Sequence, residues 1–134
     1  MLSSALRYSR GVYSERLLDH FQNPRNVGEL EEADLRVEVS NPICGDILRL
    51  TATLAGERIG EVTYRTRGCT ASIAVGSALT ELLVGKSPPE ALAIDRDVIE
   101  AAVGGLSNES KHAAVLAVDG IRALVGEWRA RGAA

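Results

Sequence analysis

The two cysteines of this chain lie in similar sequence settings, and both settings suit chemistry. Cys44 lies in the segment NPICGD (41–46), between a proline and a Gly-Asp pair, and Cys69 follows a glycine at the start of a predicted helix. Asp46 could direct a carboxylate toward the same metal ion as the Cys44 thiolate. At a helix N-terminus, the macrodipole and the free N–H groups favour the thiolate, which is the form that binds metals. These residues predict a metal site or a reactive thiol.

A structural role is the alternative for both cysteines, since a free cysteine is commonly a small buried hydrophobe. The 24 residues between Cys44 and Cys69 do not form a CxxC-type metal motif. Asp46 shares one face of a predicted strand with Leu48 and Leu50. An acid in that position needs a partner, which the open end of a sheet could provide. Residue chemistry alone therefore leaves the structural role, the metal site and the reactive thiol open.

The elements that would position these residues follow from hydrophobic periodicity. Alternating apolar residues predict a strand over 35–40 and a hairpin over 46–66, with its turn at AGER (55–58). SPPE (87–90) predicts a capping box. Helical spacing predicts helices over 14–22 and 70–84, short helices through 90–94 and 95–104, and a last helix that starts at Ser107 or Asn108 and buries Ala117 or Val118.

Consecutive strands followed by consecutive helices predict an α+β fold, with a three-stranded antiparallel sheet packed against helices. The chain of 134 residues has the length of one domain. We expect a single domain over 13–134, preceded by an N-terminal arm over 1–12. The alternative for that arm is an organellar targeting remnant, because the arm contains Arg7 and Arg10.

Composition excludes several classes of protein. The formal net charge is −3, and no basic stripe with interleaved aromatic residues is present, so we expect no nucleic-acid partner. No apolar run approaches the roughly 20 residues that span a bilayer, so we expect no membrane association. Two cysteines are too few for a disulfide scaffold, which predicts a reducing cytoplasm as the compartment.

Three motifs together resemble one family. YSERLLDHFQNPRNVG (13–28), NPICGD (41–46) and GCTASIAVGSALTELLVGK (68–86) are similar, in order and spacing, to the U-type iron–sulfur cluster assembly scaffolds, which are the IscU, SufU and NifU N-terminal family. The resemblance extends from Tyr13 to about Trp128. The chain lacks the extra segment that SufU proteins carry before their last helix, so it is similar to the IscU branch.

The resemblance implies a [2Fe-2S] cluster, or a zinc ion in its place, bound at one end of the molecule. The ligands that it implies are Cys44, Asp46, Cys69 and His112. These residues would supply two thiolates, a carboxylate and an imidazole, and histidine does replace thiolate on some [2Fe-2S] clusters. The same donors suit tetrahedral zinc. His20 matches a family position in the first helix and is interpreted as structural.

The chain departs from the family pattern near His112. The family has a third cysteine directly after this histidine, where this sequence has Ala113. Before that position IscU proteins carry a Leu-Pro-Pro-Val-Lys segment that a DnaK-type chaperone binds, but here the matching stretch reads LSNES (106–110). A DnaK-type chaperone is therefore doubtful as a partner.

The resemblance implies a scaffold without enzymatic activity. Its implied partners are a cysteine desulfurase, an iron donor and the apo-proteins that accept the cluster. Two alternatives stay open at this point. One is a diverged zinc-binding module that regulates a desulfurase, or accepts sulfur from it, and the other is a sulfurtransferase that carries a persulfide on Cys69.

Overall fold

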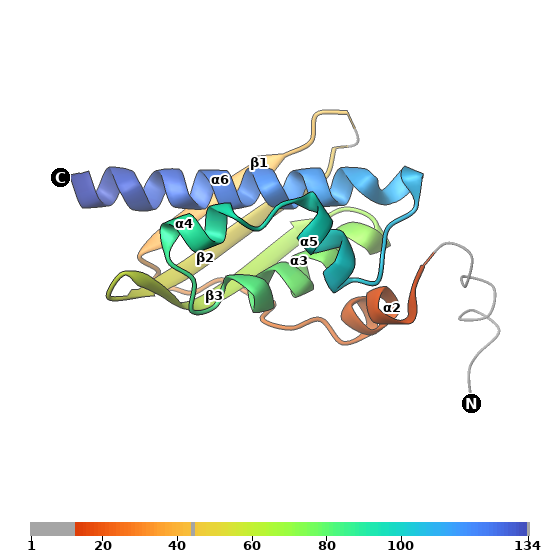
Figure 1. The fold of residues 1–134 in the computed structure, drawn as a ribbon, viewed down its shortest axis with the longest axis horizontal. Helices are drawn as coiled ribbons and strands as arrows, with labels where there is room; N and C mark the ends of the chain where they lie inside the picture. The colour runs from red at the N-terminus through yellow and green to blue at the C-terminus, as the bar shows by residue number, and fades with distance from the viewer. Residues whose placement is uncertain (1–12, 44, 134) are drawn as a thin grey trace.

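A computed structural model describes residues 13–43 and 45–133 (Figure 1). The predicted N-terminal arm over 1–12 and the candidate ligand Cys44 lie outside the described residues.

Three strands form one antiparallel sheet, as predicted, and their order in the sheet is β1-β2-β3. β1 (Leu35–Ser40) pairs with β2 (Ile47–Ala55), which pairs in turn with β3 (Arg58–Arg67). The turn between β2 and β3 consists of residues 56 and 57, and Gly56 has a φ of 65°, which glycine adopts without steric cost. The antiparallel register places Ile47 opposite Arg67, so the start of β2 and the end of β3 lie together.

The helices begin and end close to the predicted positions. Ser14 caps the first helix, and Ser87 and Glu90 form the predicted capping box. A 3₁₀ turn (Asn108–Ser110), which begins after Ser107, leads directly into the last helix. The helices are α2 (Glu15–Gln22), α3 (Thr70–Leu83), α4 (Pro88–Leu92), α5 (Arg96–Ala102) and α6 (Lys111–Ala133).

Helices α3 and α6 pack on the sheet, and small residues allow their close approach (Figure 1). A Cβ atom added at Gly76 of α3 would lie 2.4 Å from a ring carbon of Tyr64 on β3. A Cβ atom added at Gly120 of α6 would lie 3.0 Å from a methyl carbon of Leu48 on β2. The core between these layers is mostly aliphatic, and Tyr64 is its largest fully buried side chain.

Helix α2 and the segment after it contact α3 and β3. The imidazole Nδ1 of His20 lies 2.7 Å from the hydroxyl of Ser77 on α3. The backbone N–H of Arg25 also donates to Ser77, and Val27 forms a parallel bridge with Tyr64. His20 is buried in this contact, which agrees with its structural interpretation.

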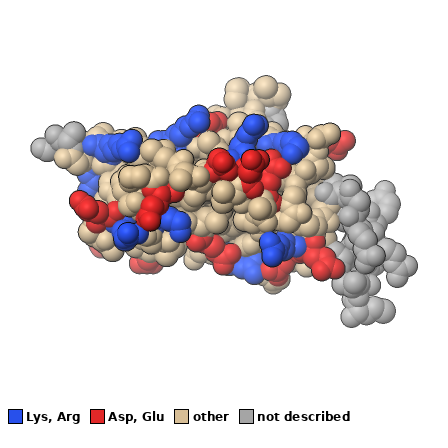
Figure 2. All heavy atoms as spheres, viewed as in Figure 1, with Lys and Arg blue, Asp and Glu red and all other residues tan. Residues whose placement is uncertain are grey.

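Charges of both signs are interspersed on the face seen in Figure 2. Several charged side chains form ion pairs: Arg49 of β2 pairs with Glu38 of the neighbouring β1 at 2.7 Å and with Glu29, in the segment before β1, at 2.9 Å. Among the described residues, no helix combines the length and the apolar character that crossing a membrane requires.

Candidate metal centre

Asp46 reaches the end of the sheet through a tight turn. The N–H of Gly45 donates to the carbonyl of Asn41, and the N–H of Asn41 donates to the carbonyl of Asp46. Gly45 has a φ of 77°, which an L side chain rarely adopts. Asp46 comes directly before β2 and is only 6% exposed. The turn therefore places a buried carboxylate at the end of the sheet.

Cys69 occupies the N-cap position of α3, two residues after the end of β3. Its side chain makes no capping hydrogen bond to the helix backbone, and the residue is exposed. Burial of the thiol raises the pKa of Cys69, but polar contacts with Ser72, His112 and the backbone of Ala71 at the helix N-terminus outweigh burial and lower the pKa. This environment favours the thiolate, the metal-binding form.

His112 lies in the first turn of α6, and a backbone contact fixes its ring. Nδ1 lies 2.9 Å from the carbonyl oxygen of Glu109, which can only accept a hydrogen bond. The Nδ1–H therefore donates, and in the neutral ring Nε2 keeps a free lone pair. Burial lowers the pKa of His112, but contacts with Cys69, the Glu109 carbonyl and Asp46 raise the pKa overall in the metal-free protein.

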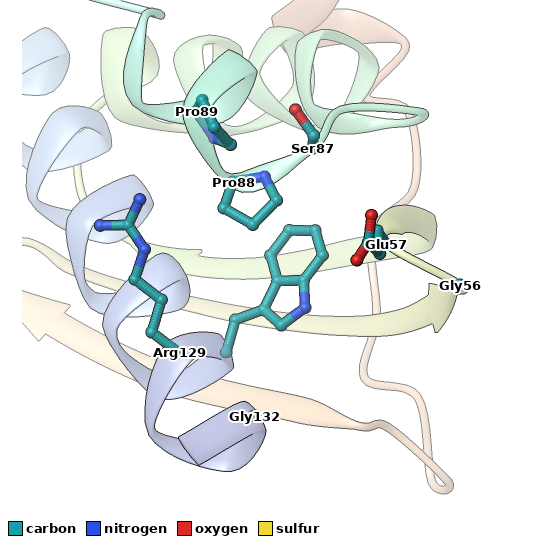
Figure 3. A pocket seen from close by; sticks show the side chains of 8 residues that line it. Gly56, Glu57, Ser87, Pro88, Pro89, Arg129 and Gly132 are labelled. Carbon is teal, nitrogen blue, oxygen red and sulfur yellow. The ribbon is translucent and has the colours of Figure 1, made fainter.

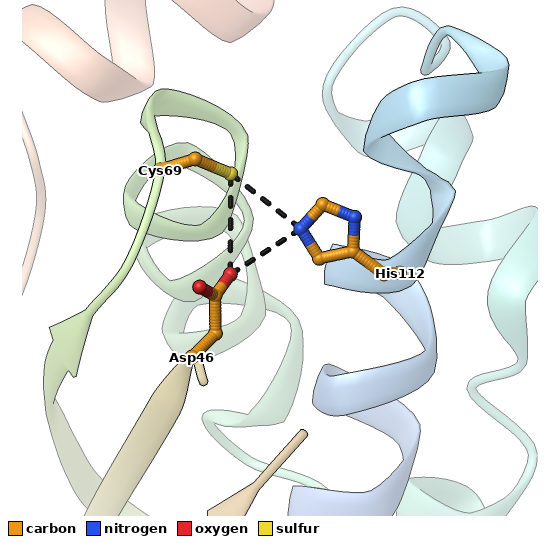
Figure 4. A group of neighbouring side chains, drawn as sticks. All are labelled: Asp46, Cys69 and His112. Atoms are coloured by element: carbon orange, nitrogen blue, oxygen red, sulfur yellow. Dashed lines mark hydrogen bonds and ion pairs between the residues drawn. The ribbon is translucent and has the colours of Figure 1, made fainter. Parts of the chain in front are cut away.

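The three side chains converge from three separate parts of the chain (Figure 4). His112 Nε2 lies 3.3 Å from Asp46 Oδ2 and 3.6 Å from Cys69 Sγ. Cys69 Sγ lies 4.0 Å from Asp46 Oδ2. The structure thus brings together three of the four residues predicted as ligands, and the fourth, Cys44, lies outside the described residues.

These separations fit the ligand shell of one small ion. A tetrahedral zinc ion, with bonds of about 2.3 Å to sulfur and about 2.0 Å to nitrogen or oxygen, holds its N and O ligands about 3.3 Å apart and its S and N ligands about 3.5 Å apart. The observed N–O and S–N distances are 3.3 and 3.6 Å, and the S–O distance of 4.0 Å is somewhat wider. A thiolate, an imidazole and a carboxylate are also donor types that zinc accepts.

Two residues at this centre were not predicted from the sequence. The hydroxyl of Ser72 donates to Oδ2 of Asp46, and it lies 3.5 Å from Sγ of Cys69. Gly68 packs against the Asp46 carboxylate, because an added Cβ atom there would lie 2.7 Å from Cγ of Asp46. The position of Ser72, three residues after the N-cap, is the signal that could have revealed it, since side chains there commonly face the cap.

Ala113, at the position where the resemblance led us to expect a third cysteine, is buried and 2% exposed. It contributes no donor atom. The described part of the centre therefore contains one thiol, and its other two donors are a nitrogen and an oxygen.

An open groove of about 720 Å³ lies elsewhere, near the C-terminal end of α6 (Figure 3). Its lining includes Pro88, Trp128 and Arg129. At a rise of about 1.5 Å per residue, the 17 positions from His112 to Arg129 correspond to about 25 Å along the helix axis. The groove is therefore separate from the three converging donors.

Comparison with known proteins gives one consistent result. Residues 12–134 match the model of the NifU-like N terminal domain. The chain is 43% identical over 122 residues to the iron–sulfur cluster assembly scaffold protein IscU 1 of Archaeoglobus fulgidus, covering 90% of this chain and 80% of that protein. It is 37% identical over 125 residues to the scaffold protein IscU of Escherichia coli K12, covering 90% and 96%.

A solved structure supports the fold. The crystal structure of the FiSufU protein from Fervidobacterium islandicum AW-1 aligns with a TM-score of 0.71, over 87% of this chain and 98% of that one. The two sequences are 19% identical, so this likeness concerns the fold alone. The match of nearly the whole chain confirms the predicted resemblance, and the chain belongs to the NifU-like N-terminal domain family.

Proposed function

We propose that this chain is an iron–sulfur cluster assembly scaffold that receives iron and sulfide, holds a labile [2Fe-2S] cluster and passes it to apo-proteins. The observation that carries the proposal is the convergence of Cys69, Asp46 and His112 at one end of the sheet. The names of its IscU relatives support the same function.

The proposed ligands are Cys44, Asp46, Cys69 and His112. A [2Fe-2S] cluster takes four protein donors, two on each iron, and these residues would supply two thiolates, one carboxylate and one imidazole. The proposal assigns Cys44 from its motif, and it assigns the other three from the motif together with their distances.

Release of the cargo is the second part of the function, and the donor set suits it. Oxygen and nitrogen donors bind a cluster less firmly than soft thiolates. Cys69 is exposed, and the side chain of His112 is 27% exposed, so an acceptor protein could approach the cargo directly. The proposed scaffold therefore binds its cargo weakly enough to transfer it.

The proposed partners are a cysteine desulfurase, an iron donor and the acceptor apo-proteins, and the proposed compartment is the cytoplasm. The lowered pKa and the exposure of Cys69 suit it to accept sulfur from a desulfurase, since Ala113 cannot do so. In this role the chain is a carrier and not an enzyme.

Anaerobic reconstitution with iron and sulfide tests the proposal. The scaffold function predicts a visible charge-transfer absorption band and iron and sulfide in roughly equal amounts. Transfer of that band to an added apo-ferredoxin would establish the carrier role. A protein that stays colourless under these conditions would contradict the proposal.

A zinc-binding module related to the scaffolds is the second candidate function, and the donor distances favour it. The N–O and S–N separations of 3.3 and 3.6 Å suit a single tetrahedral ion, and the S–O separation of 4.0 Å is somewhat wider. In this role the protein would bind zinc and regulate a desulfurase, or accept sulfur from it. Zinc that survives reconstitution, with no bound sulfide, would support this candidate.

A further inference from the structure

Asp46 is held by two contacts that the proposed ligand set does not include. Its carboxylate is buried, and Oδ2 faces both His112 Nε2 and Cys69 Sγ. The hydroxyl of Ser72 donates to this same oxygen. Ser72 is itself only 4% exposed, so its hydroxyl is directed into the protein and toward the centre.

Gly68 provides the second contact. A Cβ atom built on Gly68 would lie 2.7 Å from Cγ of Asp46 and 2.8 and 2.9 Å from its two oxygens. All three distances are below those that real Cβ atoms show, so a side chain at this position would displace the carboxylate. The φ of Gly68 is not in the left-handed region, and the need for glycine here is therefore one of space.

The two residues that make these contacts lie in one short segment of the chain. Gly68 and Ser72 flank Cys69, which is the N-cap of α3. Ser72 lies in the first turn of the helix, and its hydroxyl is 3.5 Å from the Cys69 sulfur. The same short segment therefore contacts both the Asp46 carboxylate, directly before β2, and the Cys69 thiol, at the start of α3.

We infer that Gly68 and Ser72 are positioning residues that hold Oδ2 of Asp46 toward Cys69 and His112, so that the centre is preorganised before its metal cargo binds. This inference rests on the proposed function of the site. Loss of a hydrogen-bond partner of a ligating carboxylate commonly changes metal affinity by about 10- to 100-fold.

A titration of the metal-free protein with Co²⁺ tests the inference. Ser72→Ala should weaken Co²⁺ binding by roughly 10- to 100-fold and change the visible d–d absorption of the bound ion. Ser77→Ala is the matched control, because it removes a buried hydroxyl from the same helix at a contact with His20. It should leave Co²⁺ binding unchanged. Gly68→Ala, which displaces the same carboxylate, should reproduce the effect of Ser72→Ala.

A double-mutant cycle separates positioning from a general loss of structure. If Ser72 acts through Asp46, then Ser72→Ala should have no further effect on Co²⁺ affinity in an Asp46→Ala background. Equal losses in both backgrounds would overturn the inference. Weaker binding by Asp46→Ala together with wild-type binding by Ser72→Ala would overturn the inference and leave the proposed function in place. A wild-type chain that binds no Co²⁺ would contradict both.

Discussion

His112 Nε2 lies 3.3 Å from Oδ2 of Asp46, although the two residues belong to different parts of the fold and are 66 positions apart in the sequence. The contact joins the first turn of α6 to the start of β2. It depends on the Nδ1–H of His112 donating to the Glu109 carbonyl, which directs the other ring nitrogen toward the carboxylate. This pair and Cys69 form the described part of the candidate metal centre.

Replacing His112 by alanine should weaken metal retention by at least about tenfold, because the centre loses its only described nitrogen donor. The measurement is a Zn²⁺ competition titration against a chromophoric chelator. His20→Gln is the matched control, since His20 contacts Ser77 away from the centre. Unchanged zinc affinity in the His112→Ala protein would remove His112 from the ligand set.

Replacing Ala113 by cysteine should lengthen the lifetime of a bound cluster, because the change adds a soft thiolate beside His112. The decay of the visible absorption in the presence of a chelator, followed without air, measures this lifetime. Ala114→Cys is the control, because residue 114 is also buried but points about 100° further around the helix. If Ala113→Cys gives no gain over Ala114→Cys, the centre differs in geometry from that of its family.

Replacing Gly76 by alanine should lower the free energy of unfolding by about 1–3 kcal/mol, as overpacking does. An added Cβ atom would lie 2.4 and 2.5 Å from two ring carbons of Tyr64. Urea unfolding measures the change. Gly126→Ala, on the exposed side of α6 with no heavy atom within 4 Å of the added Cβ, should instead stabilise the protein by about 0.5–1 kcal/mol. Equal effects of the two substitutions would argue against the tight contact.

His20 should make the fold sensitive to acid. Burial lowers the pKa of His20, and Arg25 lowers it further. The unfolded chain, with a histidine pKa of about 6.5, therefore binds more protons than the folded one as the pH falls below that value. The stability that neutral His20 contributes is present above about pH 6.5 and is lost as the pH falls toward the folded pKa, by at most about 1.4 kcal/mol per pH unit.

Urea unfolding of the metal-free protein at several pH values between about 7.5 and about 5, a range that brackets the unperturbed histidine pKa, tests this linkage. The wild-type protein should lose more stability over this range than His20→Gln, whose residue 20 does not titrate. Other groups titrate in both proteins, so the difference between the two curves isolates His20. Parallel curves would show that His20 contributes nothing to the acid sensitivity.

The sequence was most informative where local chemistry decides the structure. The alternation of apolar residues predicted β1 over 35–40. The four residues SPPE (87–90) predicted the capping box that Ser87 and Glu90 form. The expectation that Asp46 needs a partner at the end of the sheet is confirmed by its contacts with Ser72 and His112.

The sequence was least informative where distant elements meet. The Ser72 contact depends on how α3 lies against the start of β2, and no local pattern encodes that approach. Likewise, the bridge between Val27 and Tyr64 joins a loop to β3, and only the packed fold reveals it. The choice between Ala117 and Val118 for the buried face of α6 was also settled by packing, with Ala117 1% exposed.

The most direct test of the central claim is iron and acid-labile sulfide analysis of the protein purified without air, for the wild-type chain and Cys69→Ser. We predict iron and sulfide in roughly equal amounts in the wild-type protein and the loss of both in Cys69→Ser. Wild-type protein with neither component, or a Cys69→Ser protein with undiminished iron and sulfide, would contradict the claim that this centre holds the cluster.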